Sequence, residues 1–333
     1  MLLAGDVGGT RTRLGLFERA PRRPRVVAVH TYLTSDFSSF GGILDAFIRE
    51  VPAPFARTRI DAAVVGVAGP VVDGTAPLTN GAWSVSAADI AARLRTSHVR
   101  LLNDLEAMAH GAGVLRPEEV VQIQSGAPRA DGNAAVIAAG TGLGQAYLHR
   151  VNGRLRPVPS EGGHADFAAR TDREIELVRM LRRWYGRAEV EHVLSGPGLL
   201  NLHRFTHEGR ACEAIGSLDG IDAPAAVSRA ALDAICPSCV EALSLFVEAY
   251  GAEAGNLALR GVATAGVFVG GGIAPRILPA LQDGRFITAF RAKGSMSALV
   301  ANIPVNVIVM PEAGLLGAAV CAQELMDEAG QVE

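Results

Sequence analysis

Two segments of the chain place short apolar runs and glycine-rich turns in the same order. From Leu2 to Phe17 the chain alternates through a glycine-rich centre, which predicts a strand, a tight turn and a second strand, with a third strand near 26–31. An apolar run at 134–139, glycines directly after it, and the Asn152-Gly153 hairpin signal predict the same elements later in the chain. We therefore expect an internal duplication of architecture, with one β-rich unit in each half.

Elsewhere along the chain, apolar runs that indicate buried strands are separated by stretches with helical spacing. These runs lie at 61–68, 99–102, 266–269 and 305–310. Ser86 followed by Asp89 has the spacing of a capping box, and beyond Thr171 the chain is mostly helical until the third run. A helix containing Gly314 and Gly317 follows the last strand. This alternation predicts an α/β fold, in which ligands bind at the carboxyl ends of strands.

The length and composition indicate a globular protein with two domains. A chain of 333 residues exceeds what one hydrophobic core usually serves, and 49% apolar against 20% charged residues argues against extended disorder. A formal net charge of -3 provides no basic surface for nucleic acid or an anionic membrane, so we expect a small-molecule ligand. The chain has no apolar run of membrane-spanning length and no basic segment ahead of the first strand, which predicts a cytoplasmic location.

Among the four cysteines, only Cys236 and Cys239 have a suggestive spacing. Such a CxxC pair can be half of a zinc site or a redox pair, but no second CxxC or Cys/His pair is evident to complete four ligands. Pro237 favours the start of a helix, and the apolar residues behind it recur at helical spacing. We therefore expect Cys239 in the first turn of a buried helix, with a structural role.

The chain has a single lysine, Lys293, which no P-loop glycines precede. A Walker A loop and the strand lysine of protein kinases both place a lysine close to nucleotide-binding glycines. Neither scheme is available here. If the protein binds a nucleotide, backbone amides and a metal ion must hold its phosphates.

A glycine-rich loop follows a strand in each half of the chain. The first runs from Asp6 to Thr10 and the second from Gly140 to Gly144. Glycines after a strand direct backbone N–H groups at an anion, and Asp6 can hold a hydrated Mg²⁺. One such loop is often a plain hairpin turn. Two such loops, each between two predicted strands and one in each half of the chain, indicate that both loops bind one polyphosphate.

A third glycine run, Gly270 to Gly272, would let a flat base lie close to a helix terminus. Together the three loops form the candidate nucleotide site. Its residues are Asp6, Gly8, Gly9, Thr10, Gly140, Thr141, Gly142, Gly144, Gly271 and Gly272.

Five polar residues have a different character and suit a sugar. They are Asn103 and Asp104 at the end of a strand, Glu161 and His164 around a Gly-Gly turn, and Glu191. Carboxylates accept hydrogen bonds from neighbouring hydroxyls, each worth about 1.5–3 kcal/mol, and a pyranose ring needs that arrangement. Structural interpretations stay open: Asp104 as a helix N-cap and Glu191 as an ordinary surface residue. His164 is a candidate because of an expected partnership with Glu161.

Together these residues resemble the bacterial glucokinases of the hexokinase and actin-like ATPase superfamily over nearly the whole chain. The matching stretches are Asp6 to Thr10 with Arg13, 66–70, Thr79-Asn80 with Trp83, 103–107, 140–144, 161–167, 193–198, 270–275 and 314–317. The resemblance implies an α/β, two-domain actin-like (ribonuclease H-like) fold with a central cleft. It implies a small domain of 1–110 completed by a C-terminal helix at about 312–333, a large domain of 111–311, and a homodimer.

The resemblance also implies an activity, the phosphorylation of glucose to glucose 6-phosphate by ATP with Mg²⁺. Asp104 is then the general base, and the residues that bind glucose hydroxyls are Asn103, Asp104, Glu161, His164 and Glu191. The chain departs from the family pattern at Arg11, where asparagine is usual, and at Ala139, where proline is usual. These departures bear on nucleotide affinity more than on sugar choice.

Related sequence families leave two other functions open. The repressor, open reading frame and kinase family normally carries a histidine with a cysteine-rich zinc cluster near the sugar, and the absence of an evident cluster favours the glucokinase branch.

A kinase of another hexose, such as mannose or an N-acetylhexosamine, would use the same scaffold. A non-catalytic sugar or nucleotide sensor is disfavoured by the presence of Asp104 and by the closeness of the first loop to Met1, which leaves no room for a DNA-binding domain.

Overall fold

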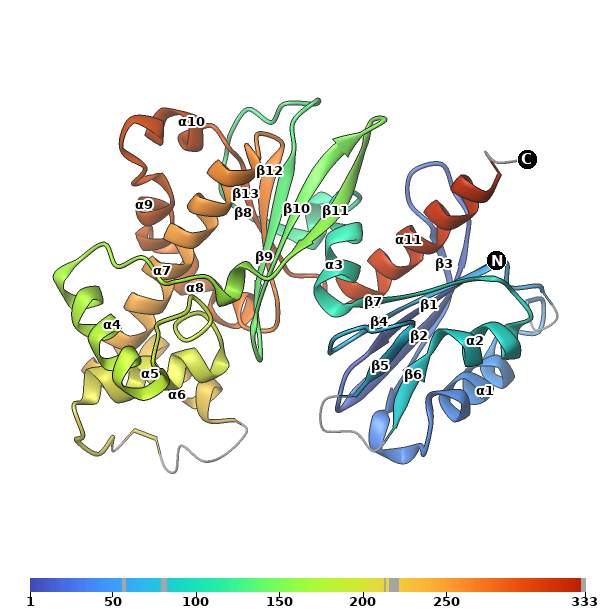
Figure 1. Ribbon diagram of the computed structural model, residues 1–333, viewed down its shortest axis with the longest axis horizontal. Coiled ribbons are helices and arrows are strands. Elements are labelled where there is room, and N and C mark those ends of the chain that lie inside the picture. Colours follow the sequence, from blue (N-terminus) through green and yellow to red (C-terminus); the bar gives the residue numbers. More distant parts are fainter. Residues whose placement is uncertain (56–57, 79–82, 213, 216–221, 331–333) are drawn as a thin grey trace. The chain divides into compact units, whose positions relative to one another are not determined.

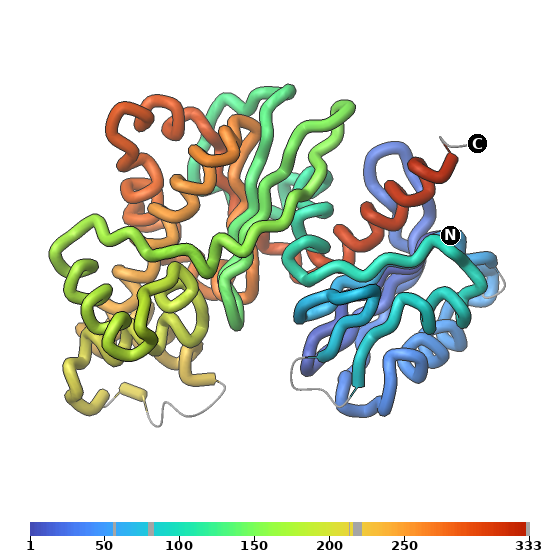
Figure 2. Tube along the Cα trace, viewed as in Figure 1, coloured from blue at the N-terminus to red at the C-terminus, as the bar shows by residue number. Residues whose placement is uncertain are grey.

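The computed structural model contains two compact units (Figures 1 and 2). It describes residues 1–55, 58–78, 83–212, 214–215 and 222–330. The first unit consists of Met1–Arg116 and Met310–Glu333, and the second of Pro117–Val309. The chain therefore leaves the first unit and returns to it near its end.

The first unit is built on a five-stranded sheet. Its strands are β1 (Leu2–Val7), β2 (Arg11–Glu18), β3 (Arg25–Leu33), β4 (Ala62–Val67) and β7 (His98–Asn103), in the order β3-β2-β1-β4-β7. β1, β2 and β3 form an antiparallel meander, whereas β1, β4 and β7 run parallel. The parallel strands consequently bring their carboxyl ends to one edge of the sheet. A small hairpin of β5 (Thr75–Pro77) and β6 (Ser84–Ser86) completes the strands described in this unit.

Helices cover both faces of this sheet (Figure 1). Alternate residues of β1 point to opposite faces, so Leu3 packs in a core with α1 (Phe40–Glu50) and α2 (Ala87–Leu94), while Leu2 packs with α11 (Ala313–Ala329). Helix α2 begins after Ser86, whose hydroxyl accepts the Asp89 amide proton, as the capping-box spacing predicts.

Helix α3 (Asp104–Ala112) packs directly against α11, and Figure 2 shows the two traces side by side in this unit. The helices approach so closely at Gly317 that a Cβ there would lie 1.6 Å from the carbonyl oxygen of Ala107. Gly111 faces the same contact, where a Cβ would lie 2.9 Å from the carbonyl oxygen of Ala313. Small residues in both helices are therefore required for this packing.

The second unit repeats the arrangement of the first in a six-stranded sheet. Its strands are β8 (Val120–Gln124), β9 (Ala134–Ala139), β10 (Leu143–Val151), β11 (Arg154–Ser160), β12 (Gly266–Gly270) and β13 (Val305–Ile308), in the order β11-β10-β9-β12-β13-β8. β9 to β11 form an antiparallel meander and β9, β12 and β13 run parallel, as in the first unit. The predicted duplication of architecture is therefore confirmed.

The helices of this unit form a group in which α7 (Pro237–Gly261) contacts β9, β10 and β12 (Figure 1). Its other members are α4 (Asp172–Tyr185), α5 (Gly196–His207), α6 (Ala223–Leu232), α8 (Leu278–Gln282), α9 (Arg285–Arg291) and α10 (Ser297–Ala301). Helix α7 contacts α5, α6 and α9 and contributes many of the largest core side chains. It begins at Pro237, and Cys239 in its first turn is fully buried, as the sequence predicts.

Tyr250 connects α7 to two strand ends that precede glycine loops. Its hydroxyl accepts the Ala139 amide proton at 3.1 Å and lies 3.2 Å from the carbonyl oxygen of Gly270. The side chain is fully buried, so these backbone groups satisfy a hydroxyl that would otherwise be costly to bury. One residue of the central helix thus positions the ends of β9 and β12.

Within the described ranges no single helix is long and apolar enough to cross a membrane. Helices α6 and α7 reach that length and composition only as a pair bent by 102°. Most of α7 is buried in the core of its own unit.

Candidate active site

In the first unit, Asn103 and Asp104 lie where β7 passes into α3. Asn103 is the N-cap of the helix, because its Oδ1 accepts the Glu106 amide proton at 2.6 Å. The interpretation of Asp104 as the cap is therefore wrong, and Asp104 is the first residue of the helix itself. Capping occupies the side-chain oxygen Oδ1 of Asn103. The side-chain NH₂ group of Asn103 can then donate to a ligand.

Asp104 carries a carboxylate in the first turn of the helix that Asn103 caps. Its Oδ1 accepts the Leu105 amide proton at 2.9 Å, within the first turn, where N–H groups and the helix dipole favour negative charge. Loss of contact with water nevertheless raises the pKa of Asp104, and the backbone hydrogen bonds only partly offset this. A carboxylate with a raised pKa is a stronger base than an ordinary aspartate.

The first glycine loop is a tight turn between β1 and β2. The Gly8 amide donates to the carbonyl oxygen of Arg11 at 2.9 Å, and the hydroxyl of Thr34 donates to the carbonyl oxygen of Gly8 at the same distance. The Thr34 amide also donates to Thr10, at 3.0 Å. Gly9 and Thr10 are exposed, so their backbone can approach a ligand. Thr34 is a buried support of this loop that the sequence did not reveal.

Asp6 lies at the end of β1 among other charged groups. An Arg13 guanidinium nitrogen lies 3.3 Å from its Oδ2. Burial raises the pKa of Asp6, Arg13 opposes this, and the negative charges of Asp104 and Glu312 raise it further. Mutual repulsion among carboxylates favours a bound cation, and oxygen ligands are what Mg²⁺ prefers, so this donor set fits a hydrated magnesium ion.

In the second unit, the loop 140–142 connects β9 to β10. The Gly140 amide donates to the carbonyl oxygen of Gly142 at 2.8 Å. The Gly196 amide, at the start of α5, donates to the carbonyl oxygen of Gly140 at 2.8 Å. Glu191 is attached to the same loop, because its Oε2 accepts the Leu143 amide proton at 2.7 Å. A candidate sugar ligand and a candidate phosphate loop are therefore joined by one hydrogen bond.

His164 lies in a short 3₁₀ helix, Gly162–His164, directly after Glu161. The His164 amide donates to the carbonyl oxygen of Glu161 at 3.0 Å, and Nδ1 of its side chain lies 2.9 Å from Oε2 of Glu189. The hydrogen bond that Nδ1 of His164 donates to the Glu189 carboxylate raises the pKa of His164 and lowers the pKa of Glu189. Sequence reasoning missed Glu189, whose position in the chain gives no sign of this contact.

The third loop follows β12, and its glycines differ in what they require. Gly271 has a φ of +84°, and a Cβ there would lie 2.3 Å from the carbonyl oxygen of Ala139. Gly272 is exposed, and a Cβ there would meet open space. Gly271 is thus fixed by backbone geometry and close packing, while the surface at Gly272 is open for a flat ligand.

Two other residues named in the sequence analysis, Lys293 and Trp83, make hydrogen bonds within their own units. Lys293 donates from Nζ to the Ala252 carbonyl at 2.8 Å and to Asn256 Oδ1 at 2.7 Å, so the single lysine is held among helices. Trp83 donates from its indole to the Phe37 carbonyl at 3.0 Å. Thr79 and Asn80, which also support the resemblance, lie outside the described residues.

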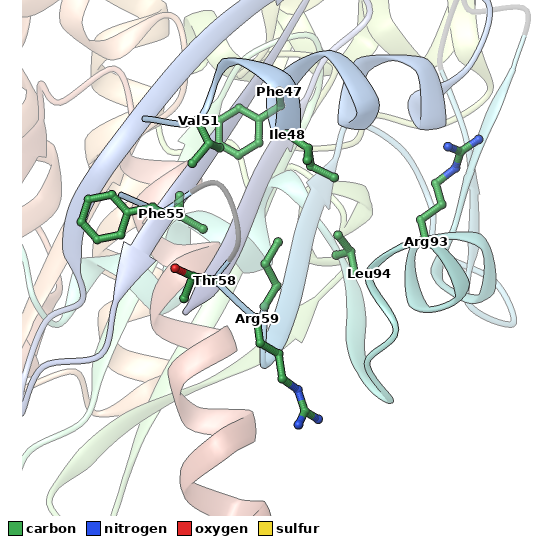
Figure 3. Close-up of a pocket in the computed structure, with 10 residues that line it drawn as sticks. Phe47, Ile48, Val51, Phe55, Thr58, Arg59, Arg93 and Leu94 are labelled. Carbon is green, nitrogen blue, oxygen red and sulfur yellow. The ribbon is translucent and has the colours of Figure 1, made fainter. Parts of the chain in front are cut away.

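A pocket of about 190 Å³ lies in the first unit between α1 and the segment that precedes β4 (Figure 3). Phe47, Val51 and Phe55 give it apolar walls, and Arg59 and Arg93 lie at its margin. None of the candidate site residues lines it. The carboxyl ends of the strands, where the candidates lie, are therefore the more informative region.

Comparison with known proteins identifies the family of this chain. A model of the family "Glucokinase" matches residues 3–325. The chain belongs to the glucokinase family. A glucokinase of Nostoc punctiforme is 36% identical over 343 residues, which cover 98% of this chain and 99% of that protein.

Solved structures of glucokinases share the fold of this family member. A glucokinase from an Antarctic psychrotroph has a TM-score of 0.86 at 31% identity, covering 97% of this chain and 98% of that one. A ROK family glucokinase from Streptomyces griseus, solved with glucose and AMPPNP, has a TM-score of 0.62 at 21% identity and covers 97% and 99%. The expected two-domain actin-like ATPase fold is therefore confirmed.

Proposed function

We propose that this glucokinase transfers the γ-phosphoryl group of ATP to the 6-hydroxyl of glucose, with Asp104 as the general base. The observation that carries the proposal is that Asn103 and Asp104 have different roles at the start of α3. Asn103 caps the helix, so the carboxylate of Asp104 is available for chemistry and its pKa is raised. The family supports the reaction class.

The proposed step is in-line phosphoryl transfer. The carboxylate of Asp104 accepts the proton of the 6-hydroxyl as that oxygen forms a bond to phosphorus, and the bond from phosphorus to the β-γ bridging oxygen breaks to leave ADP. Positioning and charge neutralisation lower most of the barrier in such transfers. Bound Mg²⁺ would neutralise phosphate charge, with Asp6 holding it through water. The amides of Gly8 to Thr10 and of Gly140 to Gly142 would orient the phosphates.

Glucose recognition requires residues of both units. Asn103 and Asp104 belong to the first, and Glu161, His164 and Glu191 belong to the second. We propose that water is excluded from the bound sugar, as enzymes that transfer phosphoryl groups commonly do. Glucose is the preferred sugar in this proposal, since an epimer would leave one of these polar groups unpaired.

The decisive experiment measures ADP release with glucose and Mg-ATP for the wild type and for Asp104→Asn. The asparagine keeps the shape of the side chain but cannot accept the proton. We expect kcat to fall at least ~100-fold, as is typical for loss of a general base, while calorimetry still detects glucose binding. Asp89→Asn, an exposed aspartate in the first turn of α2, serves as the matched control and should keep normal kcat.

A panel of sugars in the same assay tests the substrate. A higher kcat/KM for mannose or an N-acetylhexosamine than for glucose would replace glucose in the proposal, and binding without ADP formation would replace catalysis with sensing. We further propose, from the family resemblance, that the enzyme works in the cytoplasm as a magnesium-dependent homodimer. Light scattering after size-exclusion chromatography tests the dimer, and titration of Mg²⁺ into chelator-treated enzyme tests the metal.

A further inference from the structure

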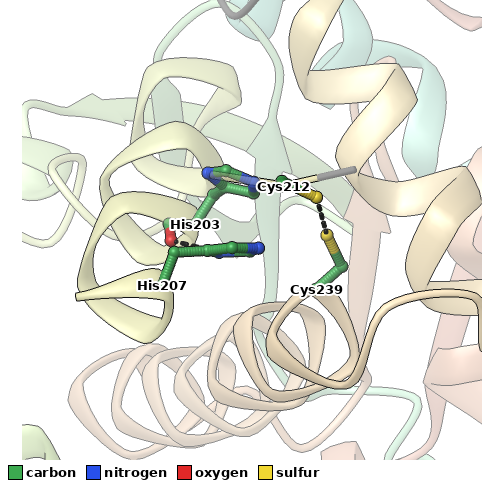
Figure 4. A group of neighbouring side chains, drawn as sticks. All are labelled: His203, His207, Cys212 and Cys239. Atoms are coloured by element: carbon green, nitrogen blue, oxygen red, sulfur yellow. Dashed lines mark hydrogen bonds between the residues drawn. The ribbon is translucent and has the colours of Figure 1, made fainter. Parts of the chain in front are cut away.

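Five potential metal ligands gather in the second unit, and none of them is among the residues proposed for catalysis or for binding sugar and nucleotide. His203 and His207 lie one turn apart on α5, Cys212 follows that helix, and Cys236 and Cys239 lie at the start of α7. The ligand atoms of His203, His207, Cys212 and Cys239 all lie within 4.8 Å of one another (Figure 4). The expectation that the CxxC pair lacks partners is therefore wrong.

The distances in this cluster match a tetrahedral zinc site. For Zn–S bonds of about 2.3 Å and Zn–N bonds of about 2.05 Å, tetrahedral angles place two sulfurs about 3.8 Å apart and a sulfur and a nitrogen about 3.6 Å apart. The Sγ atom of Cys212 lies 3.8 Å from that of Cys239 and 3.8 Å from that of Cys236. The Sγ atom of Cys236 lies 3.4 Å from Nε2 of His207. Disulfide sulfurs would be about 2.05 Å apart, and all these cysteines are free thiols.

The tautomer of His207 is fixed in the form that a metal requires. Its Nδ1 lies 2.8 Å from the carbonyl oxygen of His203 and must carry the proton to donate there. Nε2 then keeps its lone pair, and this is the nitrogen that faces the thiols. A backbone acceptor on the other ring nitrogen is the usual support of a metal-bound histidine.

His203 provides an independent indication of a missing partner. The residue is only 3% exposed, and neither of its ring nitrogens has a hydrogen-bond partner among the described residues. Its ring stacks on that of His207 with centroids 3.8 Å apart, which directs it into the same cluster (Figure 4). Buried imidazole nitrogens are normally satisfied, so an orphaned pair beside three thiols indicates an absent ligand.

We propose that this cluster is a structural zinc site. His207, Cys212 and Cys239 supply three ligands, and Cys236 or His203 supplies the fourth. Binding would release the thiol protons and leave Zn²⁺ with thiolate and neutral imidazole ligands, with no position open for a substrate. The ion would join the end of α5 to the start of α7. Because the start of α5 donates to Gly140 of a glycine loop, the site would stabilise the scaffold that carries that loop.

The experiment measures metal content and thermal stability, which do not depend on the proposed sugar kinase activity. The full chain is expressed with zinc in the medium, desalted, and analysed by elemental mass spectrometry. We expect about one zinc per chain, and a fall in Tm of at least about 5 °C after the zinc is stripped with EDTA under reducing conditions. Cobalt added to the stripped protein should give the thiolate charge-transfer absorption of a tetrahedral site.

Matched variants locate the ion. Cys212→Ser and His207→Asn should lose the zinc, whereas Cys321→Ser, which removes a thiol from the other unit, and His149→Asn, which removes an exposed histidine, should keep it. His203→Phe preserves the ring stack without its nitrogens: loss of zinc assigns His203 as the fourth ligand, and retention assigns Cys236. Circular dichroism verifies that each variant is folded.

Three results would overturn the proposal. The first is zinc content below about 0.1 per folded wild-type chain after expression with zinc and incubation with equimolar ZnCl₂. The second is unchanged zinc content in both Cys212→Ser and His207→Asn. The third is a disulfide among Cys212, Cys236 and Cys239 in protein purified without oxidant, shown by peptide mapping.

Discussion

Nδ1 of His110 lies 3.0 Å from Oε2 of Glu324, and both side chains are more than nine-tenths buried. The two residues join α3, whose first residue is Asp104, to the C-terminal helix α11. Burial alone would lower the pKa of His110, but hydrogen bonding to Cys321 and the carboxylate of Glu324 outweigh it and raise the pKa to about 9. Helix α3, which carries the proposed base Asp104, is therefore held against α11 by the ion pair of His110 and Glu324.

This pair predicts a pH-dependent contribution to stability. The pKa of His110 is raised above its ordinary value of 6.5, so the native state binds the proton more tightly than the unfolded state. The contribution is fully present below pH 6.5 and is lost as pH rises through about 9. Glu324→Gln should lower Tm clearly at pH 6 and much less at pH 9.5, as measured by scanning calorimetry. An equal loss of Tm at both pH values would show that the charge pair is not the cause.

The close approach of α3 and α11 predicts the effect of a single methyl group. In Gly317→Ala, the new Cβ would collide with the backbone of Ala107, so one helix must move, at a cost of about 1–3 kcal/mol in the free energy of unfolding. Gly314→Ala on the same helix is the control, since its Cβ would be in ordinary contact 3.6 Å from Asp6. Urea unfolding measures both. Equal stability of the two variants would contradict the packing argument.

The hydrogen bond between Glu191 and Leu143 predicts that glucose and ATP affinities are linked. Glu191→Ala removes both the proposed sugar ligand and the acceptor that holds the loop, so KM should rise for glucose and for ATP. Glu191→Gln keeps a carbonyl oxygen for the Leu143 amide, so we expect a higher KM for glucose with a nearly normal KM for ATP. If alanine leaves the KM for ATP unchanged, the loop does not depend on this bond.

His164 and Glu189 provide a test that does not require activity. The carboxylate of Glu189 raises the pKa of His164, so Glu189→Gln should return that pKa toward 6.5, as followed by NMR titration of the imidazole. Glu18→Gln, in the other unit, is the control and should leave the pKa unchanged. A pKa of His164 that does not fall in Glu189→Gln would exclude this carboxylate as the cause.

The sequence predicted the features that are encoded locally. The two hairpins were evident because glycines between alternating apolar runs allow little else, and the start of α7 was evident at Pro237. The residues at strand ends, Asn103 and Asp104, were also recognisable as a pair. What could not be predicted was which of them caps the helix, because both side chains can cap and only the backbone at Asn103 decides.

Contacts between distant segments were the main source of error. Glu189 reaches His164 because a β-bridge pairs Asp166 with Glu189, and no local pattern encodes that bridge. Likewise, His203 and His207 approach Cys236 and Cys239 only when α5 packs on α7. Their helical spacing, with two histidines one turn apart, was the signal that could have revealed the zinc ligands.

The hydroxyl of Tyr250 has a consequence for substitution at Ala139. Proline at 139 has no amide proton, so it would remove the hydrogen bond that the Ala139 amide donates to the hydroxyl oxygen of Tyr250. The phenol oxygen would then keep only its role as a donor to a carbonyl. Residues 139 and 250 should therefore change together: phenylalanine at 250 should cost less stability beside a proline than beside the alanine of this chain.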